Sequence, residues 1–371
     1  GVEVQGREVV LRFDGYDSRI VANLDNEGRA LVGHWEKTGA SSIGKMPFRA
    51  EKTATAPSRF LPLAALGTEG SLGSPAADEL TSVAGTWAID LTDDEGTTPA
   101  EGIFEQQGDR VLGTLRTPTG DHRFLEGSYE KGVLRLSAFD GGHAFLYQAK
   151  AASGDTLDGD FWSRDAYHAT FKARRITSGG VPLPNAWGEI GLTNSEGRFH
   201  FTFEDLDGHP VSLSDPRFVG KAVIVNVFGS WCPNCNDEAP LLAAWSREYR
   251  DRGLEVVGLA YEVTGQIERD RVQVRRYAER HGIDYPLLLA GTSDKKKAGA
   301  TLPDLSAVAA FPTTIFIGRD GKVRKIHSGF DGPATGAHHE ALKREFTAAI
   351  EELLGLTQES PKPIESPKSA S

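Results

Sequence analysis

Cys232 and Cys235 are the only cysteines in the 371-residue chain, and two residues separate them in the stretch "GSWCPNCNDEAP" (229–240). Two thiols at this spacing can close a disulfide and open it again, so they can carry a pair of electrons. The same pair could instead hold a metal ion, staple the fold or react with peroxide. Each of these four kinds of site makes its own demands on the rest of the sequence.

The surrounding residues favour redox chemistry over the other three kinds of site. A disulfide between the two cysteines closes a very short loop, which gains almost no loop-closure entropy as a staple. Zinc takes four ligands, and the cysteines supply two. The adjacent His338 and His339 would point to different faces of a helix and could not both complete the site, so no metal is expected. The residues around Gly229 lack the proline and threonine that frame a peroxidase cysteine. A redox switch is the leading interpretation, and a thiol peroxidase stays an alternative.

The position of the cysteines between a strand and a helix gives each of them a role. The apolar run "AVIVNVF" (222–228) predicts a strand that is covered on both faces. Cys232 then lies at the amino end of the next helix, where free N–H groups and the helix dipole favour a thiolate. Cys235 lies within the same turn and can attack a mixed disulfide formed at Cys232. Glu238 shares the helical face of Cys235 and could exchange protons with both thiols.

Together with "AFPTTIFIGRDGKV" (310–323), this stretch resembles the thioredoxin superfamily, in particular its TlpA/ResA-like branch of extracytoplasmic disulfide reductases. The resemblance covers about residues 190–355. It implies that Cys232 attacks a client disulfide, that Cys235 resolves the mixed disulfide and that Glu238 manages the protons. The cis-proline of the family falls on Pro312, and the backbone before it would pair with the extended chain of a client. The residues that then border the client are Trp231, Pro233, Asn234, Phe311 and Thr313.

The resemblance also implies partners and a location. The cofactor would be the redox-active disulfide alone, and the partners would be protein disulfide clients and an upstream thiol electron donor. The chain would be bacterial and extracytoplasmic, either periplasmic or membrane-anchored after removal of a leader. The dipeptide Pro233-Asn234 departs from that of thioredoxin, and these middle residues tune thiolate stability and redox potential. The family favours a reductase. The alternative is a ligand- or partner-binding envelope protein whose thioredoxin domain serves as a redox sensor.

The C-terminal half shows the alternation of strands and helices that such a site needs. We expect a thioredoxin-like domain over 191–356 with a mixed sheet flanked by helices. Its expected elements are strands at 198–205, 222–228 and 254–261, a charged helix ending at Gly282, a hairpin across Asp320-Gly321, and a closing helix at 338–355 with Leu342, Phe346, Ile350 and Leu353 on one face. Residues 357–371 are rich in proline and polar residues and predict a disordered tail.

The N-terminal half consists of short alternating segments between turn signals. Over 1–175 this pattern predicts an all-β antiparallel barrel or sandwich, with a meander at 1–50 and eight strands after a long connection at 51–80. A linker at 176–190 follows. The net charge of −11 argues against a nucleic-acid surface, and no apolar run is long enough to predict a transmembrane helix.

Two turns of this β-rich half carry residues that could form a second site. Asp121 and His122 lie in "TGDHRFLEG", and Asp140 and His143 lie in "FDGGHAF". If these turns meet at one end of a barrel, they could bind a ligand or a partner. The alternative is ordinary turn chemistry, in which aspartate side chains bond to the nearby backbone.

Overall fold

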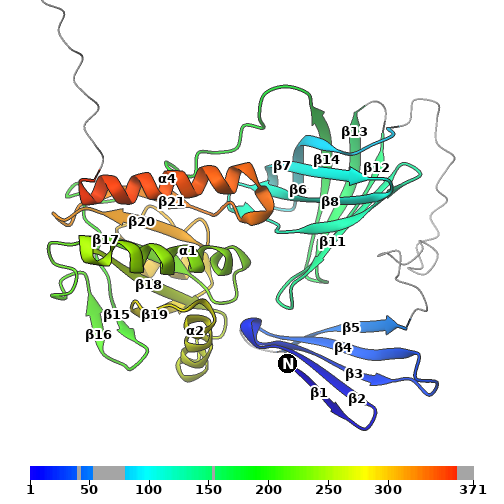
Figure 1. Ribbon diagram of the computed structural model, residues 1–371, viewed down its shortest axis with the longest axis horizontal. Helices are drawn as coiled ribbons and strands as arrows, with labels where there is room; N and C mark the ends of the chain where they lie inside the picture. Colours follow the sequence, from blue (N-terminus) through cyan, green and yellow to red (C-terminus); the bar gives the residue numbers. More distant parts are fainter. Residues whose placement is uncertain (40–42, 53–79, 153–154, 357–371) are drawn as a thin grey trace, which may run out of the picture.

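The computed structural model of the protein describes residues 1–39, 43–52, 80–152 and 155–356 (Figure 1). Three β-sheets form its framework. The expected fold class is confirmed: an antiparallel all-β region is followed by a mixed α/β domain. The expected connection at 51–80 lies almost wholly outside the described residues, and the expected tail at 357–371 lies entirely outside them.

The first sheet is a meander of five antiparallel strands. Alternate side chains along its strands point to one face, where Ile20, Ala22 and Trp35 are buried. A 3₁₀ turn at Asp14–Tyr16 joins the second strand to the third. The strands are β1 Val2–Gln5, β2 Glu8–Phe13, β3 Ser18–Leu24, β4 Ala30–Thr38 and β5 Ile43–Glu51.

The second sheet closes into a barrel, because β8 pairs with β10 as well as with β7. All eight expected strands are present, and a short strand, β9, extends β8 at one rim. Trp87, Tyr147 and Phe161 help to fill the interior. The strands are β6 Gly85–Asp93, β7 Gly96–Gln107, β8 Arg110–Thr117, β9 Gly120–Asp121, β10 Leu125–Glu130, β11 Val133–Phe139, β12 Ala144–Ala151, β13 Thr156–Ser163 and β14 Tyr167–Ile176.

The third sheet is mixed and has seven strands in the order β16-β15-β19-β18-β17-β20-β21. The strand expected at 198–205 is shorter than predicted and begins at Thr202, because Asn194 and Asp304 hold the backbone of Arg198 and His200 in a loop. The strands are β15 Thr202–Asp205, β16 Pro210–Ser212, β17 Ala222–Phe228, β18 Leu254–Glu262, β19 Leu287–Thr292, β20 Thr313–Ile317 and β21 Val323–Ser328.

The helices of this domain are close to those expected. The expected closing helix buries Leu342, Phe346 and Ile350, while Leu353 is only half-buried and Leu354 enters the core. The α-helices are α1 Pro233–Tyr249, α2 Ile267–His281, α3 Lys295–Thr301 and α4 Ala337–Leu354, and 3₁₀ turns lie at Arg250–Arg252 and Pro333–Thr335.

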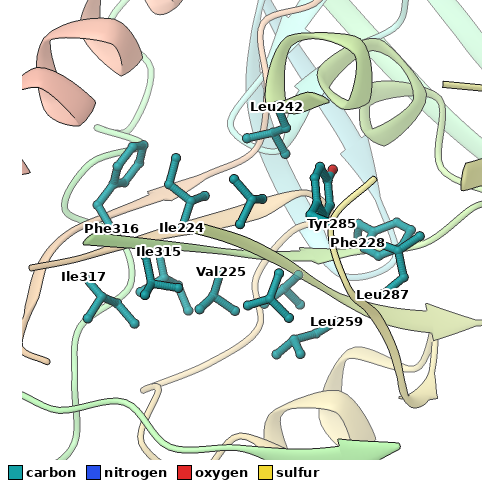
Figure 2. Packing of buried hydrophobic residues seen from close by; sticks show 14 of the residues in the cluster. Ile224, Val225, Phe228, Leu242, Leu259, Tyr285, Leu287, Ile315, Phe316 and Ile317 are labelled. Carbon is teal, nitrogen blue, oxygen red and sulfur yellow. The ribbon is translucent and has the colours of Figure 1, made fainter. Parts of the chain in front are cut away.

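Both faces of the seven-stranded sheet are covered, as the apolar run at its centre predicts. Ile224 of β17 lies opposite Phe316 of β20, and Leu242 of α1 packs on the same side (Figure 2). Val225 and its partner Ile315 point to the other side. Because every residue of β17 is buried, a polar side chain on this strand needs hydrogen-bond partners inside the core.

The barrel and the first sheet both border the C-terminal domain (Figure 1). Arg269 of α2 pairs with Asp17 of the first sheet at 2.6 Å, and Arg116 of β8 pairs with Asp331 at 2.9 Å. These two ion pairs connect the N-terminal sheets to the domain that carries the cysteines.

Among the described residues, no helix has both the length and the apolar character needed to cross a membrane.

Candidate active site

The two cysteines lie where β17 gives way to α1. Cys232 is the N-cap residue of α1, and its Sγ lies 3.5 Å from the backbone nitrogen of Cys235, which donates to it. Pro233 occupies the first helical turn, where a backbone N–H would have no partner within the helix. Both cysteines are free thiols, and both are buried. The structure thus places both sulfur atoms in a buried site at the start of α1.

The loop that precedes β20 also contacts Cys232. The Cys232 thiol donates to the carbonyl oxygen of Phe311 at 3.2 Å, and the Phe311–Pro312 peptide bond is cis. The Thr313 hydroxyl donates to the Ala310 carbonyl oxygen at 2.8 Å, which holds this loop closed. The loop brings a backbone acceptor into contact with the first thiol.

Glu238 lies beneath the thiols in a closed polar cluster. Its Oε1 accepts from the Thr314 hydroxyl at 2.6 Å, and its Oε2 accepts from Asn226 Nδ2 at 2.7 Å. Burial raises the pKa of Glu238 to about 7, although the two hydrogen bonds act to lower it. Burial also raises the pKa of Cys235 well above its ordinary value, and the charges of Cys232 and Glu238 add to this effect. A carboxyl that titrates near neutrality therefore lies close to a thiol that holds its proton.

Glu262, at the end of β18, is a second buried carboxyl that the sequence analysis missed. Its two oxygens accept from the backbone N–H of Ser230 at 2.8 Å and from the Ser230 hydroxyl at 2.7 Å. Burial raises the pKa of Glu262 to about 7, against the effect of these two bonds. Next to Ser230, Trp231 donates Nε1 to the Tyr261 carbonyl oxygen at 2.8 Å and packs edge-on against Phe311 at 5.6 Å. β18 thus anchors the loop that carries Cys232.

One feature of the sequence could have identified Glu262 as a residue of the site. It ends a buried strand that runs parallel to β17, and the carboxyl ends of adjacent parallel strands meet at one edge of a sheet.

Two lysines lie close enough to Cys232 to interact with its charge, and the sequence analysis named neither. Burial lowers the pKa of Lys37 to about 8, and Arg164 acts in the same direction, whereas Cys232 raises it. Burial also lowers the pKa of Lys295, and Cys232 raises it. Lys37 comes from β4 of the first sheet and Lys295 from α3. Two cations from distant parts of the chain thus lie close to the first cysteine.

Asn234, the second residue between the cysteines, is bound by the barrel. Its Nδ2 donates to Oδ1 of Asp121 at 2.7 Å, and the same oxygen accepts from the backbone N–H of Gly332 at 2.7 Å. Asp121 is 4% exposed, and burial raises its pKa. Asp121, one of the residues expected at a second site, therefore contacts the dithiol turn itself.

Arg123 of the barrel contacts both helix α1 and the 3₁₀ turn of the first sheet beside this contact. Its guanidinium donates to Asp237 of α1 at 2.8 Å, to the Tyr16 hydroxyl of the first sheet at 3.0 Å and to Asp140 of the barrel at 3.4 Å. Burial raises the pKa of Asp140, but the nearby His143 ring and the backbone N–H groups of His143 and Gly142 outweigh it and hold the pKa at about 2. Asp140 and His143 therefore lie at an internal junction of the chain.

His122 has a different environment from the other three residues of the expected second site. Its ring lies among Phe145, Tyr147 and Phe161 of the barrel, and its Nδ1 is hydrogen-bonded to the Tyr147 hydroxyl. Burial lowers the pKa of His122 to about 4. Asp121 thus contacts the C-terminal domain through Asn234 and Gly332, whereas Asp140 and His143 contact residues of the barrel and of the first sheet. That these residues form a ligand or partner site remains a prediction.

The geometry supports two-electron thiol chemistry. A buried dithiol lies at a helix start, a backbone carbonyl contacts its first sulfur, and a carboxyl that titrates near pH 7 lies below its second. In the part of the chain that the structure describes, no group of three or more histidine, cysteine, aspartate or glutamate residues could hold a metal ion.

Comparison with known proteins points to the same part of the chain. Residues 195–342 match the family model described as Redoxin. The chain is 29% identical over 191 residues to the thiol-disulfide oxidoreductase ResA of Halalkalibacterium halodurans, an alignment that covers 51% of this chain and 94% of that protein. It is 30% identical over 141 residues to the thioredoxin-like protein YneN of Bacillus subtilis, covering 38% of this chain and 75% of that protein.

The chain is also similar to a solved structure. A thiol:disulfide interchange protein of the thioredoxin family from Chlorobium tepidum TLS is 28% identical, with 43% of this chain and 95% of that chain covered and a TM-score of 0.32.

Proposed function

This chain belongs, through residues 195–342, to the redoxin family of thioredoxin-like thiol-disulfide oxidoreductases, and on that premise we propose that it reduces disulfides in client proteins. The observation that carries the proposal is the arrangement of Cys232, Cys235 and Glu238. A dithiol at a helix start is coupled to a buried carboxyl with a pKa of about 7.

The first step is attack by Cys232. Its sulfur is the N-cap of α1, where the backbone N–H of Cys235 points at it, and Lys37 and Lys295 add positive charge. The thiolate attacks one sulfur of the client disulfide, and a mixed disulfide forms. The other client sulfur leaves as a thiolate and takes a proton.

The second step is resolution by Cys235. The Cys235 thiol gives its proton to the carboxylate of Glu238 and attacks the sulfur of Cys232. The second client thiolate leaves, and a disulfide joins Cys232 to Cys235. An upstream thiol donor then returns the pair to the dithiol, and no further cofactor takes part.

The client would lie against the loop that carries Pro312. The backbone before this proline would pair with an extended client segment, and the bordering side chains would be Trp231, Pro233, Asn234, Phe311 and Thr313. As part of the same proposal, the protein acts outside the cytoplasm of a bacterium and reduces disulfides rather than forming them, and the resemblance in sequence supports both points.

Trapping of the client tests the proposal. A Cys235→Ala chain cannot resolve the mixed disulfide, so it should hold client proteins covalently and release them with dithiothreitol. A Cys232→Ala chain has no attacking thiol and serves as the control that traps none. The wild-type dithiol should also reduce disulfides in solution. If Cys235→Ala traps nothing and the wild type reduces neither insulin nor a small disulfide, the proposal is wrong.

A further inference from the structure

The hairpin of β8 and β9 lies directly on the dithiol turn. Its Asp121 accepts from Asn234 and from the backbone of Gly332, each at 2.7 Å. The packing is tight: a Cβ atom on Gly120 would lie 2.5 Å from Oδ1 of Asn234. One on Gly329 would lie 2.9 Å from the backbone carbon of Thr119 in the same hairpin. The hairpin thus contacts both the dithiol turn, residues 232–235, and the loop after β21.

Hydrogen bonds to both carboxylate oxygens hold Asp121 in place. Oδ2 of Asp121 accepts from the backbone N–H of Arg123 at 2.9 Å, so both of its oxygens have partners. A buried carboxylate is costly unless hydrogen bonds compensate for its lost hydration. On either side of it, ion pairs join Arg116 to Asp331 and Arg123 to Asp237, at 2.9 Å and 2.8 Å.

This closed arrangement leaves little of the dithiol exposed. Cys232 is 5% exposed, Asn234 9% and Phe311 6%. A protein client would have to bring a disulfide sulfur into bonding contact with Cys232 and lay its backbone along Phe311. The hairpin occupies the neighbouring surface, whereas a small disulfide needs far less room.

We propose that Asp121 is a specificity-determining residue of this oxidoreductase. By holding the β8–β9 hairpin over Asn234 and Gly332, it keeps protein disulfides away from Cys232 until the hairpin is displaced, while small disulfides react with the closed form. Clients are then selected by their ability to displace the hairpin. This inference rests on the proposed thiol-disulfide exchange at Cys232.

The electron balance is the same for both classes of client. The thiolate of Cys232 breaks the substrate S–S bond, and Cys235 then breaks the mixed disulfide. Two substrate thiols leave, the two electrons come from the dithiol, and a dithiol reductant such as dithiothreitol restores it. The hairpin changes access to the first step only.

Single-turnover kinetics of the full-length, pre-reduced chain test the inference. We would measure the oxidation of the dithiol by bis(2-hydroxyethyl) disulfide and by insulin, and divide the first rate constant by the second. The same ratio for free dithiothreitol, which has no hairpin, gives the reference. The wild-type ratio should exceed that of dithiothreitol.

Loosening the hairpin should selectively speed the reaction with the protein. Asp121→Ala and Arg123→Ala should each raise the insulin rate by about tenfold or more, because lost buried hydrogen bonds shift the equilibrium toward the open form. The rate of Arg123→Ala with the small disulfide should change by less than about twofold, since access to it does not depend on opening. Arg110→Ala is the matched control, because Arg110 lies on β8 but pairs with Glu126 within the barrel.

Two further measurements keep the outcomes separate. Arg123 is partly exposed, so its substitution perturbs the fold less than that of Asp121, and thermal unfolding would verify that each variant is folded. Each rate of modification of Cys232 in the wild type would be divided by the rate of the same reagent with a free thiol. This relative rate should be much lower for a maleimide carrying a long polymer than for iodoacetamide. Equal accessibility to the two reagents, or unchanged insulin rates in both variants, would overturn the role of the hairpin. A dithiol that reduces no disulfide of either size would instead overturn the proposed function.

Discussion

Asn226 on β17 donates a hydrogen bond of 2.7 Å to Glu238 on α1, and this bond joins the central strand to the carboxyl below the thiols. Burial still dominates, and it raises the pKa of Glu238 to about 7. A group with this pKa can accept and return a proton within one catalytic cycle at neutral pH.

Glu238→Gln should slow the resolving step. An amide cannot accept the proton of Cys235, so release of the second thiol from a small aromatic disulfide should slow roughly 10²-fold at pH 7. Stopped-flow absorbance measures this release. Glu248→Gln, at an exposed position of the same helix, is the control. Release at the wild-type rate in Glu238→Gln would exclude Glu238 as the proton acceptor.

Thr314→Val should move the pH dependence of the same step upward. The Thr314 hydroxyl donates to Oε1 of Glu238 at 2.6 Å, and this bond lowers the pKa of the carboxyl against the effect of burial. Valine removes the bond, so the pKa of Glu238 rises and the carboxylate that accepts the proton forms only at higher pH. We expect the midpoint of the pH–rate profile to rise by roughly one unit. If the midpoint stays the same or falls, the pH dependence of this step does not arise from Glu238.

Glu262→Gln should make folding stability less dependent on pH. Burial raises the pKa of Glu262 from 4.5 to about 7, so the folded chain favours the protonated form. The wild type therefore loses stability as the pH rises from about 4.5 to about 7, whereas glutamine does not titrate. Glutamine can also accept from the Ser230 N–H and donate to its hydroxyl.

Urea unfolding at several pH values checks this sign. We subtract the free energy of unfolding of the wild type from that of Glu262→Gln. This difference should be constant below pH 4.5, rise by on the order of 3 kcal/mol between pH 4.5 and about 7, and then level off. A flat difference across this range would show that Glu262 is ionised in both states.

Arg116→Ala should weaken the junction between the barrel and the C-terminal domain. Arg116 pairs with Asp331 at 2.9 Å and with Glu101, whose side chain is 5% exposed. Removing the cation leaves the buried carboxylate of Glu101 with the partly exposed His338, 3.3 Å away, in place of a permanently charged guanidinium, which should cost about 3 kcal/mol in urea unfolding. Arg110→Ala removes an exposed pair with Glu126 and should cost less than about 1 kcal/mol. Equal effects of the two substitutions would mean that the junction contributes little to stability.

The local pattern of the sequence was enough to predict most elements of the fold. The alternation in 85–173 marked all eight barrel strands, and the apolar run at 222–228 marked the central strand of the third sheet. The strand expected at 198–205 was too long, because alternation cannot show that Asn194 and Asp304 hold its first residues in a loop.

The parts of the site within one strand–helix unit were predictable for the same reason. Cys232, Cys235 and Glu238 lie on one turn and a half of helix, so spacing alone places them together. Asp121 meets Asn234 only because the barrel packs against helix α1 of the C-terminal domain, and no local periodicity encodes that packing. The sequence marked the turn of Asp121 as a candidate ligand site, and its hydrogen bonds to Asn234 and Gly332 could not be read from the sequence.

The position of the hairpin along the chain bears on biosynthesis. Whether the polypeptide leaves a ribosome or a translocation pore, the barrel strands emerge before Cys232, and N-terminal domains generally fold first. Asp121 is therefore in place when the helix that begins at Pro233 forms. The nascent thiols are sheltered as soon as their own domain folds, which shortens the interval in which a stray oxidant or another unfolded chain could capture them.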